Sequence, residues 1–295
     1  MAKHEFGGDW TTEKLERIRK YLCAYTTIFA SNPRARLLTP IYLDAFAGTG
    51  HRADLRSEGG EKRFLDDSAD PDAESLKKGS ARIALEVEPP FKRYVFIERR
   101  EERVRDLEDL RNMFRDKAAC VEIVHDDANT FLQGWCAKTN WRQCRAVVFL
   151  DPYGMQVDWA TVEALARTRA VDLWLLFPLG VAVNRLLTRS EPPPSEWGDA
   201  LTRIFGTPTW RDEFYPRHET QTLFGPEVTQ QKEADFDRIG RFFVARLKTI
   251  FAKVAENPLP LRNSTNTPLY LLCFAAGNSK GAATAVKIAQ DILKG

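Results

Sequence analysis

Short apolar runs alternate with amphipathic stretches along this chain, which is the pattern of strands alternating with helices. The apolar runs predict buried parallel strands at residues 40–45, 93–98, 120–125, 146–151 and 171–177. Helical spacing predicts helices over 11–30, 81–87, 99–117, from Asn129, and over 158–168. Alternation of this kind folds as a parallel sheet with helices on both faces.

The C-terminal third predicts a different connection. A helix over 235–255 precedes apolar runs at 259–262 and 269–276, which are joined by a polar turn and predict an antiparallel hairpin. A last helix begins near Gly281. We therefore expect an α/β fold with a mostly parallel, seven-stranded sheet, in a single domain over residues 1–295 with an N-terminal helix at 11–30.

Two segments break the alternation. Residues 51–79 are polar and contain Gly59-Gly60, which predicts a long loop that is mobile or closes over a site. Residues 189–233 are rich in proline and aromatic side chains, including Trp210 and Tyr215, and read as an insertion after the fifth strand. This insertion either packs on the main core, which is the commoner case, or presents a substrate or partner surface.

Composition places the chain among globular proteins, with 43% hydrophobic and 28% charged residues in 295. No apolar stretch approaches the ~20 residues of a membrane span, and the polar N-terminus lacks a signal-peptide pattern, so we expect a cytoplasmic protein without membrane contact. The net charge of +2 does not by itself indicate a nucleic-acid partner.

Cysteine and histidine positions do not suggest a metal site. The five cysteines form no C-x-x-C pair, and the four histidines are scattered without ligand spacing. Cys120, Cys144 and Cys273 lie in or beside predicted strands, where reduced core thiols are expected.

The first predicted strand ends at Asp44 and opens into a turn of small residues at 47–50. Bare backbone after a strand-end carboxylate suits a ligand that carries an amine or hydroxyls. It does not suit a triphosphate, because no Gly-Lys-Ser/Thr follows. A plain tight turn is the alternative. The candidate ligand-binding residues here are Asp44, Phe46, Ala47, Gly48 and Gly50.

Acidic side chains also end the next strands, at Glu98, Asp127 and Asp151. One such acid is usually a turn or helix cap, whereas four in series indicate a cofactor cleft at the carboxyl edge of the sheet. Glu98 is placed to accept hydrogen bonds from ribose hydroxyls. Asp127, next to Ala128, is placed to accept from an adenine amino group, with Asp126 as the competing candidate.

The fourth strand end, Asp151-Pro152-Tyr153-Gly154, differs in kind. Proline stiffens the turn, and tyrosine offers a ring face for stacking a flat substrate. The Asp151 carboxylate and backbone carbonyls can accept from an –NH₂ group. These residues are therefore candidate catalytic residues, and the alternative is a simple turn after a buried strand.

The motifs D-x-F-A-G-x-G (44–50), a strand ending in Glu98, D-A-N-x-F (127–131) and F-L-D-P-Y-G (149–154) together resemble a class I S-adenosylmethionine-dependent methyltransferase. D-P-Y-G is similar to the (D/N)-P-P-Y motif of enzymes that methylate exocyclic amines of bases, and to the D-P-F-G of transfer-RNA guanine-N2 dimethyltransferases. The resemblance implies a Rossmann-like class I methyltransferase fold that binds S-adenosylmethionine at the strand-end residues.

The whole chain also resembles the three-Cys-motif partner proteins, called TcmP. The shared stretches include Gly8-Asp9-Trp10 with Lys14-Leu15, Gly79-Ser80, residues 96–98 and 149–154, the aromatic insertion, residues 269–277 and Lys280-Gly281. The resemblance implies a partner with a three-cysteine, radical-SAM-like pattern.

Our leading hypothesis is an enzyme that transfers a methyl group from S-adenosylmethionine to the exocyclic amine of a nucleobase in nucleic acid. One alternative is a weakly catalytic or non-catalytic S-adenosylmethionine-binding subunit that serves the three-cysteine partner. The other alternative is a protein N-methyltransferase, although the stacking face of Tyr153 favours a planar acceptor.

Overall fold

The structure is a computed structural model that describes residues 9–47, 79–222 and 225–294. Its main sheet has eight strands, namely β1 Thr39–Asp44, β2 Arg93–Glu98, β3 Val121–His125, β4 Cys144–Leu150, β5 Val171–Phe177, β8 Lys253–Val254, β9 Leu259–Arg262 and β10 Pro268–Ala276. The helices are α1 Asp9–Ser31, η1 Ala35–Leu37, α2 Ser80–Glu86, α3 Glu101–Met113, η5 Ala118–Cys120, α4 Ala128–Lys138, α5 Trp159–Arg167, η6 Leu179–Val183, α6 Asn184–Leu186, α7 Ser195–Phe205, α8 Trp210–Phe214, α9 Phe236–Lys248 and α10 Ala282–Lys294.

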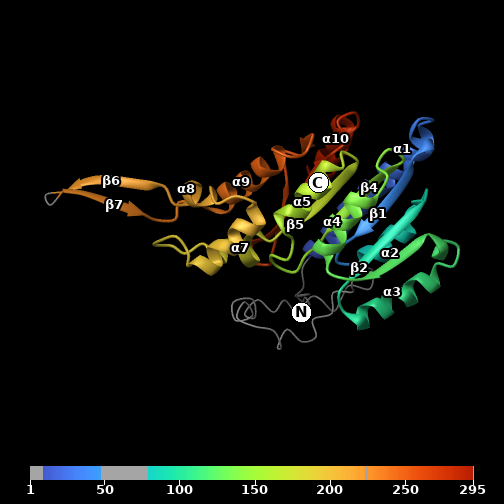
Figure 1. Ribbon diagram of the computed structural model, residues 1–295, viewed down its shortest axis with the longest axis horizontal. Helices are drawn as coiled ribbons and strands as arrows, with labels where there is room; N and C mark the ends of the chain where they lie inside the picture. Colours follow the sequence, from blue (N-terminus) through green and yellow to red (C-terminus); the bar gives the residue numbers. More distant parts are fainter. Residues whose placement is uncertain (1–8, 48–78, 223–224, 295) are drawn as a thin grey trace, which may run out of the picture.

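The strand order is β3-β2-β1-β4-β5-β10-β8, and β9 pairs with β10 off this path (Figure 1). β1 to β5 are parallel to their neighbours, whereas β10 runs antiparallel to β5, β8 and β9. The chain winds outward from β1 in both directions, so a switch in strand order lies between β1 and β4. The predicted α/β fold with a Rossmann-like, mostly parallel sheet is confirmed, with the antiparallel strand in its predicted place.

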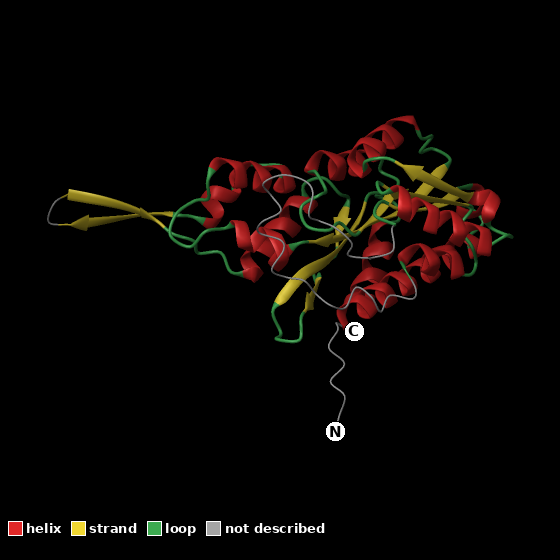
Figure 2. Cartoon of the chain, turned by 90° about the horizontal axis from the view of Figure 1, so that it is seen from below, coloured by secondary structure: helices red, strands yellow, loops and turns green. Residues whose placement is uncertain are grey.

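Helices cover both faces of the sheet (Figure 2). Along β1 the side chains alternate, so that Ile41 and Leu43 pack toward α4, α5, α7 and α9, while Tyr42 packs toward α1, α2, α3 and α10. The central strands β1, β2, β4 and β5 are largely buried on both sides, which explains their continuous apolar runs, whereas the edge strand β3 is only partly buried.

Some predicted boundaries need correction. The helix predicted over 235–255 ends at Lys248, and the chain then adds the short edge strand β8, in which Val254 pairs with Ala275 of β10. The sheet therefore has one strand more than the seven predicted. Cys120 is exposed in η5 rather than buried, because it precedes the edge strand β3, whereas Cys273 in β10 is buried as predicted.

The insertion after β5 is divided into a packed part and a projecting part. Trp210, Phe214 and Tyr215 are fully buried, so burial against the core is confirmed for these aromatic residues. β6 Arg217–Thr222 and β7 Gly225–Gln230 then form a separate two-stranded hairpin, which projects away from the body (Figure 1, Figure 2). We call β6 and β7 the arm.

Of the loop predicted over residues 51–79, only Gly79 lies within the described residues. In the described segments, no helix combines the length and apolar character needed to cross a bilayer.

Candidate functional site

The predicted site residues gather at the carboxyl edge of the parallel strands. Asp44 ends β1 in register with Phe149 of β4 and Phe96 of β2, and Asp151 follows two residues beyond Phe149. Glu98 ends β2 on the other side of β1. Parallel strands end at the same edge, so the structure brings these three acids to one side of the sheet.

Asp44 is a fully buried acid, with 0% of its surface exposed. Its Oδ1 accepts a hydrogen bond from the Phe46 N–H at 3.1 Å. Burial is the main cause that raises the pKa of Asp44 to about 7, and the negative charge of Asp151 contributes in the same direction. The opposing, pKa-lowering contributions come from Ser80, the Phe46 N–H and Lys14. A cation beside this carboxyl would favour its ionised form.

The turn after β1 is anchored by backbone hydrogen bonds to the two neighbouring strands, β4 and β2. The Ala45 N–H donates to the Phe149 carbonyl and the Ala47 N–H donates to the Ile97 carbonyl, each at 3.1 Å. Ala47 is buried, and Phe46 packs against the core from a partly buried position. Gly48 and Gly50, the other predicted ligand contacts of this turn, lie outside the described residues.

Glu98 is held in a defined orientation at the end of β2. It is 8% exposed, and its Oε1 accepts from the Arg100 N–H at 2.8 Å. Its Oε2 lies 3.8 Å from Nη1 of Arg103, which is a loose ion pair. Burial lowers the pKa of Arg103, an effect that the Glu98 charge opposes. One carboxylate oxygen is thus fixed by backbone, and the other keeps capacity to accept from a ligand.

Asp127 is the N-cap of α4. Its Oδ1 accepts from the Thr130 N–H at 3.0 Å and from the Thr130 hydroxyl at 3.2 Å, and its side chain is exposed. The neighbouring Asp126 accepts from the Asp127 N–H at 2.7 Å. Ala128 is buried as the first residue of α4. The capping role that competed with ligand binding is therefore present, and the adenine contact stays a prediction.

Asp151 forms an ion pair that we did not predict from the sequence. Its Oδ2 lies 2.5 Å from Nζ of Lys14 in α1, and the two side chains are 23% and 7% exposed. The Lys14 ammonium also lies 5.4 Å from the ring centroid of Trp10, which stacks on Tyr270 at 5.3 Å. A sequence signal did exist, because Lys14 occupies the buried helix face of α1 one turn before Ile18.

The D-P-Y-G loop is braced by α4. The Asn129 side chain donates to the Gln156 carbonyl at 2.8 Å and accepts from the Asp158 N–H at 3.0 Å. Gln156 in turn accepts from the Tyr153 N–H at 2.9 Å. Gly154 has a φ of +75°, a backbone conformation that favours glycine. Asn129 lies inside the D-A-N motif, yet the sequence did not indicate this bracing role.

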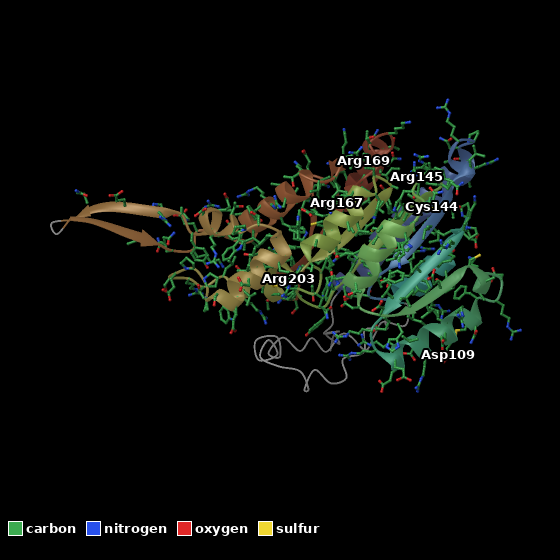
Figure 3. All side chains as sticks on the ribbon, viewed as in Figure 1. Asp109, Cys144, Arg145, Arg167, Arg169 and Arg203 are labelled. Carbon is green, nitrogen blue, oxygen red and sulfur yellow. The ribbon has the colours of Figure 1, made fainter. Side chains whose placement is uncertain are left out.

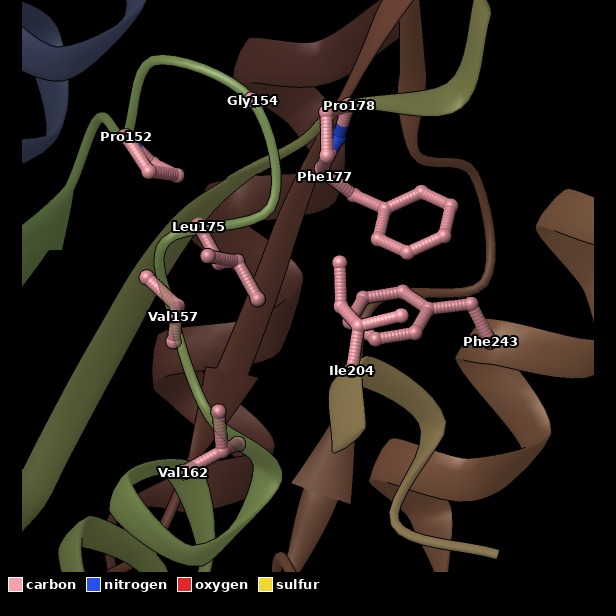
Figure 4. Close-up of a pocket in the computed structure, with 9 residues that line it drawn as sticks. All are labelled: Pro152, Gly154, Val157, Val162, Leu175, Phe177, Pro178, Ile204 and Phe243. Atoms are coloured by element: carbon pink, nitrogen blue, oxygen red, sulfur yellow. The ribbon is translucent and has the colours of Figure 1, made fainter. Parts of the chain in front are cut away.

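The loop also rests on a small apolar recess (Figure 4). Pro152 and Gly154 form one side, and the rings of Phe177 and Phe243 stack at 3.9 Å on the other. Ile204 of α7 completes the lining. Pro152 is buried here, whereas Tyr153 is 37% exposed, so its ring is available to a ligand from outside.

A half-buried acid with a raised carboxyl pKa lies at the opposite end of the parallel strands, where Figure 3 shows Arg145 at the start of β4. Asp172, near the start of β5, accepts from the Tyr21 hydroxyl at 2.7 Å. Burial raises the pKa of Asp172 to about 6, although the Tyr21 hydrogen bond and the Arg145 charge lower it. A raised carboxyl pKa alone therefore does not mark the candidate site.

Within residues 9–47, 79–222 and 225–294, the side chains form no group of three or more His, Cys, Asp or Glu residues suited to a metal ion.

Comparison with known proteins adds only distant structural likenesses. No protein-family model matches the chain, and no curated protein matches it. Protein LPL1258 of Legionella pneumophila, from the DUF519 family, is 13% identical, with a TM-score of 0.46 over 99% of this chain and 93% of that one. The candidate methyltransferase yhhF of Escherichia coli is 15% identical, with a TM-score of 0.30 over 75% of this chain and 86% of that one. A candidate rRNA methylase from Clostridium thermocellum is 10% identical, with a TM-score of 0.29 over 72% of this chain and 94% of that one.

Proposed function

We propose that this protein is an S-adenosylmethionine-dependent methyltransferase that methylates an exocyclic amine of a nucleobase in nucleic acid. The observation that carries the proposal is the gathering of Asp44, Glu98 and Asp151 at the carboxyl edge of a sheet with methyltransferase-type strand order. In such sheets ligands bind at this edge, beside the switch in strand order.

The residues present fit the cofactor. The buried Asp44 carboxyl, whose pKa is about 7, suits a cationic amino group, because that charge offsets the cost of burying a carboxylate. Glu98 suits ribose hydroxyls, and Asp127 with Ala128 suits the adenine. The backbone of Phe46 and Ala47 suits the remainder, and contacts from Gly48 and Gly50, which lie outside the described residues, stay a prediction. When bound, the cofactor supplies an electrophilic methyl group.

The acceptor side is assigned to the D-P-Y-G loop. The exposed ring of Tyr153 stacks on the base, while Asp151 and the Pro152 carbonyl accept hydrogen bonds from its amine. A nucleobase amine attacks through its lone pair and loses a proton afterwards, so these residues need not act as a strong base. They align the nitrogen and exclude water.

The test begins with calorimetry of S-adenosylmethionine and S-adenosylhomocysteine binding. We expect both to bind, and Glu98→Ala to weaken binding by about 1–3 kcal/mol because the ribose loses a charged acceptor. Glu122→Ala, which removes an exposed carboxylate paired with Arg93, is the matched control and should bind as wild type. Absence of binding of either ligand would disprove the cofactor, and NAD binding would place the chain among dehydrogenases.

Methyl incorporation into bulk transfer RNA, DNA and protein extract then identifies the acceptor. Transfer to RNA or DNA supports the proposal. Transfer to protein alone would replace it with protein N-methylation.

A second candidate function is a weakly catalytic or non-catalytic S-adenosylmethionine-binding subunit, as the resemblance to the three-Cys-motif partner proteins suggests. The Lys14–Asp151 ion pair supports it, because half of the Asp151 carboxylate is already engaged within the protein. The projecting arm also supports it as a surface that a partner protein can contact. Tight cofactor binding without transfer, or transfer only with the three-cysteine partner present, would favour this function.

A further inference from the structure

The N-terminal helix α1 delivers a buried cation to the D-P-Y-G loop. Lys14 Nζ lies 2.5 Å from Asp151 Oδ2, across 137 positions of sequence. The same ammonium lies over the ring of Trp10, 5.4 Å from its centroid, and this ring is itself stacked on Tyr270. The ammonium therefore interacts with both an indole face and a carboxylate.

The two partners differ in exposure. The Lys14 side chain is 7% exposed, whereas the Asp151 side chain keeps 23% of its surface in contact with solvent. Their pairing uses Oδ2, and Oδ1 makes no hydrogen bond to any described residue. One oxygen of the Asp151 carboxylate is thus fixed by the protein, while the other keeps capacity to accept from a ligand.

Stability alone does not account for this arrangement. Burying an ion pair costs desolvation of both charges, so a buried salt bridge is weak support for a stabilising role. An apolar residue at position 14 would match the buried face of α1, where Leu15 and Ile18 lie. A carboxylate that must keep one orientation, in contrast, gains from a fixed cationic partner.

We propose that Lys14 is a positioning residue for methyl transfer, because its ammonium holds Asp151 through Oδ2 and leaves Oδ1 to the acceptor amine. This inference rests on the proposed function and deepens it. Lys14 does not touch the acceptor itself. It acts through Asp151.

The same ammonium acts on the cofactor side of the cleft. The charged and titratable groups around Asp44 are Lys14 from α1, Ser80 from α2, Tyr42 within β1, and Asp151 after β4. Lys14 lowers the pKa of Asp44, which burial raises to about 7. Removal of the ammonium therefore raises the Asp44 pKa, and the pH of half-maximal cofactor binding moves upward.

The first experiment tests the pair without turnover. Lysine amines are reductively methylated with formaldehyde, and the modification of each lysine is followed by mass spectrometry. Lys14 should react more slowly than the exposed Lys20 of the same helix, and Asp151→Asn should accelerate the reaction at Lys14 but not at Lys20. Equal rates at Lys14 in both proteins would overturn the proposal.

The second experiment compares Lys14→Met, Lys14→Arg and the control Lys20→Met. A misplaced catalytic group can cost about 10²-fold in rate, so we expect kcat to fall by about this factor in Lys14→Met. Lys14→Arg keeps the cation and should recover most of kcat, and Lys20→Met should match wild type. The pH midpoint of S-adenosylmethionine binding, measured by calorimetry, should rise in Lys14→Met alone.

Wild-type kcat in Lys14→Met overturns the proposal for Lys14 and leaves the proposed function intact. A kcat loss that follows a loss of Tm, is not restored by Lys14→Arg and leaves the pH midpoint unchanged also overturns it, because Lys14 then only anchors α1. Absence of methyl transfer by wild type to RNA, DNA and protein is a failure of the proposed function itself.

Discussion

Asp44 and Asp172 both have a raised carboxyl pKa, but only one of the two carboxyls lies in the candidate site. Burial raises the pKa of both carboxyls, to about 7 and about 6. Asp172 is satisfied by the Tyr21 hydroxyl at 2.7 Å, at the edge of the sheet where the parallel strands begin. Asp44 lies at the edge where they end, beside Asp151 and Lys14. Only Asp44 lies where a ligand cation can offset its burial.

We predict that Asp44→Asn stabilises the ligand-free protein at alkaline pH. The folded-state pKa of Asp44 is above its unfolded value, so the folded protein binds the proton more tightly and loses stability as pH rises from about 4 to about 7. An amide has no such loss. The variant should be more stable by on the order of 2–4 kcal/mol at pH 8, with little difference near pH 4, in urea unfolding.

Asp172→Asn is the matched control for this substitution. It should show the same sign of stabilisation over a lower pH range, since the pKa of Asp172 is about 6. Cofactor affinity should be lost in Asp44→Asn and kept in Asp172→Asn. Loss in both variants would mean that the affinity change is a general effect of altering the core.

We predict that the ring of Tyr153, rather than its hydroxyl, serves the acceptor. Base–aromatic stacking contributes about 1–3 kcal/mol per base, so Tyr153→Ala should lose one to two orders of magnitude in kcat/KM. Tyr153→Phe keeps the ring and should keep most activity. The side chain is 37% exposed, so neither change should lower Tm appreciably.

Asp151→Ala completes this series. It should abolish turnover and leave cofactor affinity within a few-fold, because in the proposed function Asp151 contacts the acceptor and not the cofactor. Undiminished transfer by Asp151→Ala would remove the D-P-Y-G loop from the catalytic assignment.

At the scale of elements, α4 and the loop after β4 act as one unit. Asn129 joins them through the Gln156 carbonyl and the Asp158 N–H, and its Oδ1 also accepts from the Thr161 hydroxyl at 2.8 Å. We predict that Asn129→Ala lowers kcat by about tenfold through a looser loop, while cofactor affinity changes little. Asn140→Ala, in an exposed turn, is the control, and enzyme kinetics with calorimetry are the measurement. Equal kcat in both variants would remove the bracing role.

The central strands of the parallel sheet were predictable because each is an apolar run that is largely buried on both faces. The run at 93–98 matches β2 and the run at 171–177 matches β5. β8 was missed because two residues carry no period, and its pairing of Val254 with Ala275 is set by tertiary contact. The arm was missed because its residues are mostly polar and show no alternation.

The candidate site was predictable in part for the same reason. Its carboxylates follow strand ends, and parallel topology then brings Asp44, Glu98 and Asp151 to one edge. The contacts that orient these carboxylates do not follow from strand order. Lys14 meets Asp151 only after 137 residues of chain have folded, and no local spacing in the sequence encodes that pairing.

At the scale of the whole molecule, a packed body carries one slender projection, the arm (Figure 2). An isolated two-stranded hairpin is marginally stable in water, so the arm contributes little to folding. Its described side-chain contacts to the residues at its base are a Gln230 side-chain hydrogen bond to the Tyr215 carbonyl and an exposed His218–Glu233 pair. An exposed pair contributes about 0–1 kcal/mol.

We therefore predict that replacing residues 217–230 by two glycines leaves the body intact. Arg217 and Gln230 are direct partners in the hairpin, so a short linker can join the chain at its base. Cofactor affinity should match wild type, and Tm should change by no more than about 2 °C, since the lost contacts amount to about 1 kcal/mol.

Gly206→Ala is the contrasting variant within the same insertion. Gly206 has a φ of +66° and faces the Trp159 ring, so an added methyl group meets both strain and a clash, and Tm should fall several-fold further. Scanning calorimetry of the two variants decides the matter, and a Tm loss in the arm deletion equal to that of Gly206→Ala would make the arm an integral part of the fold.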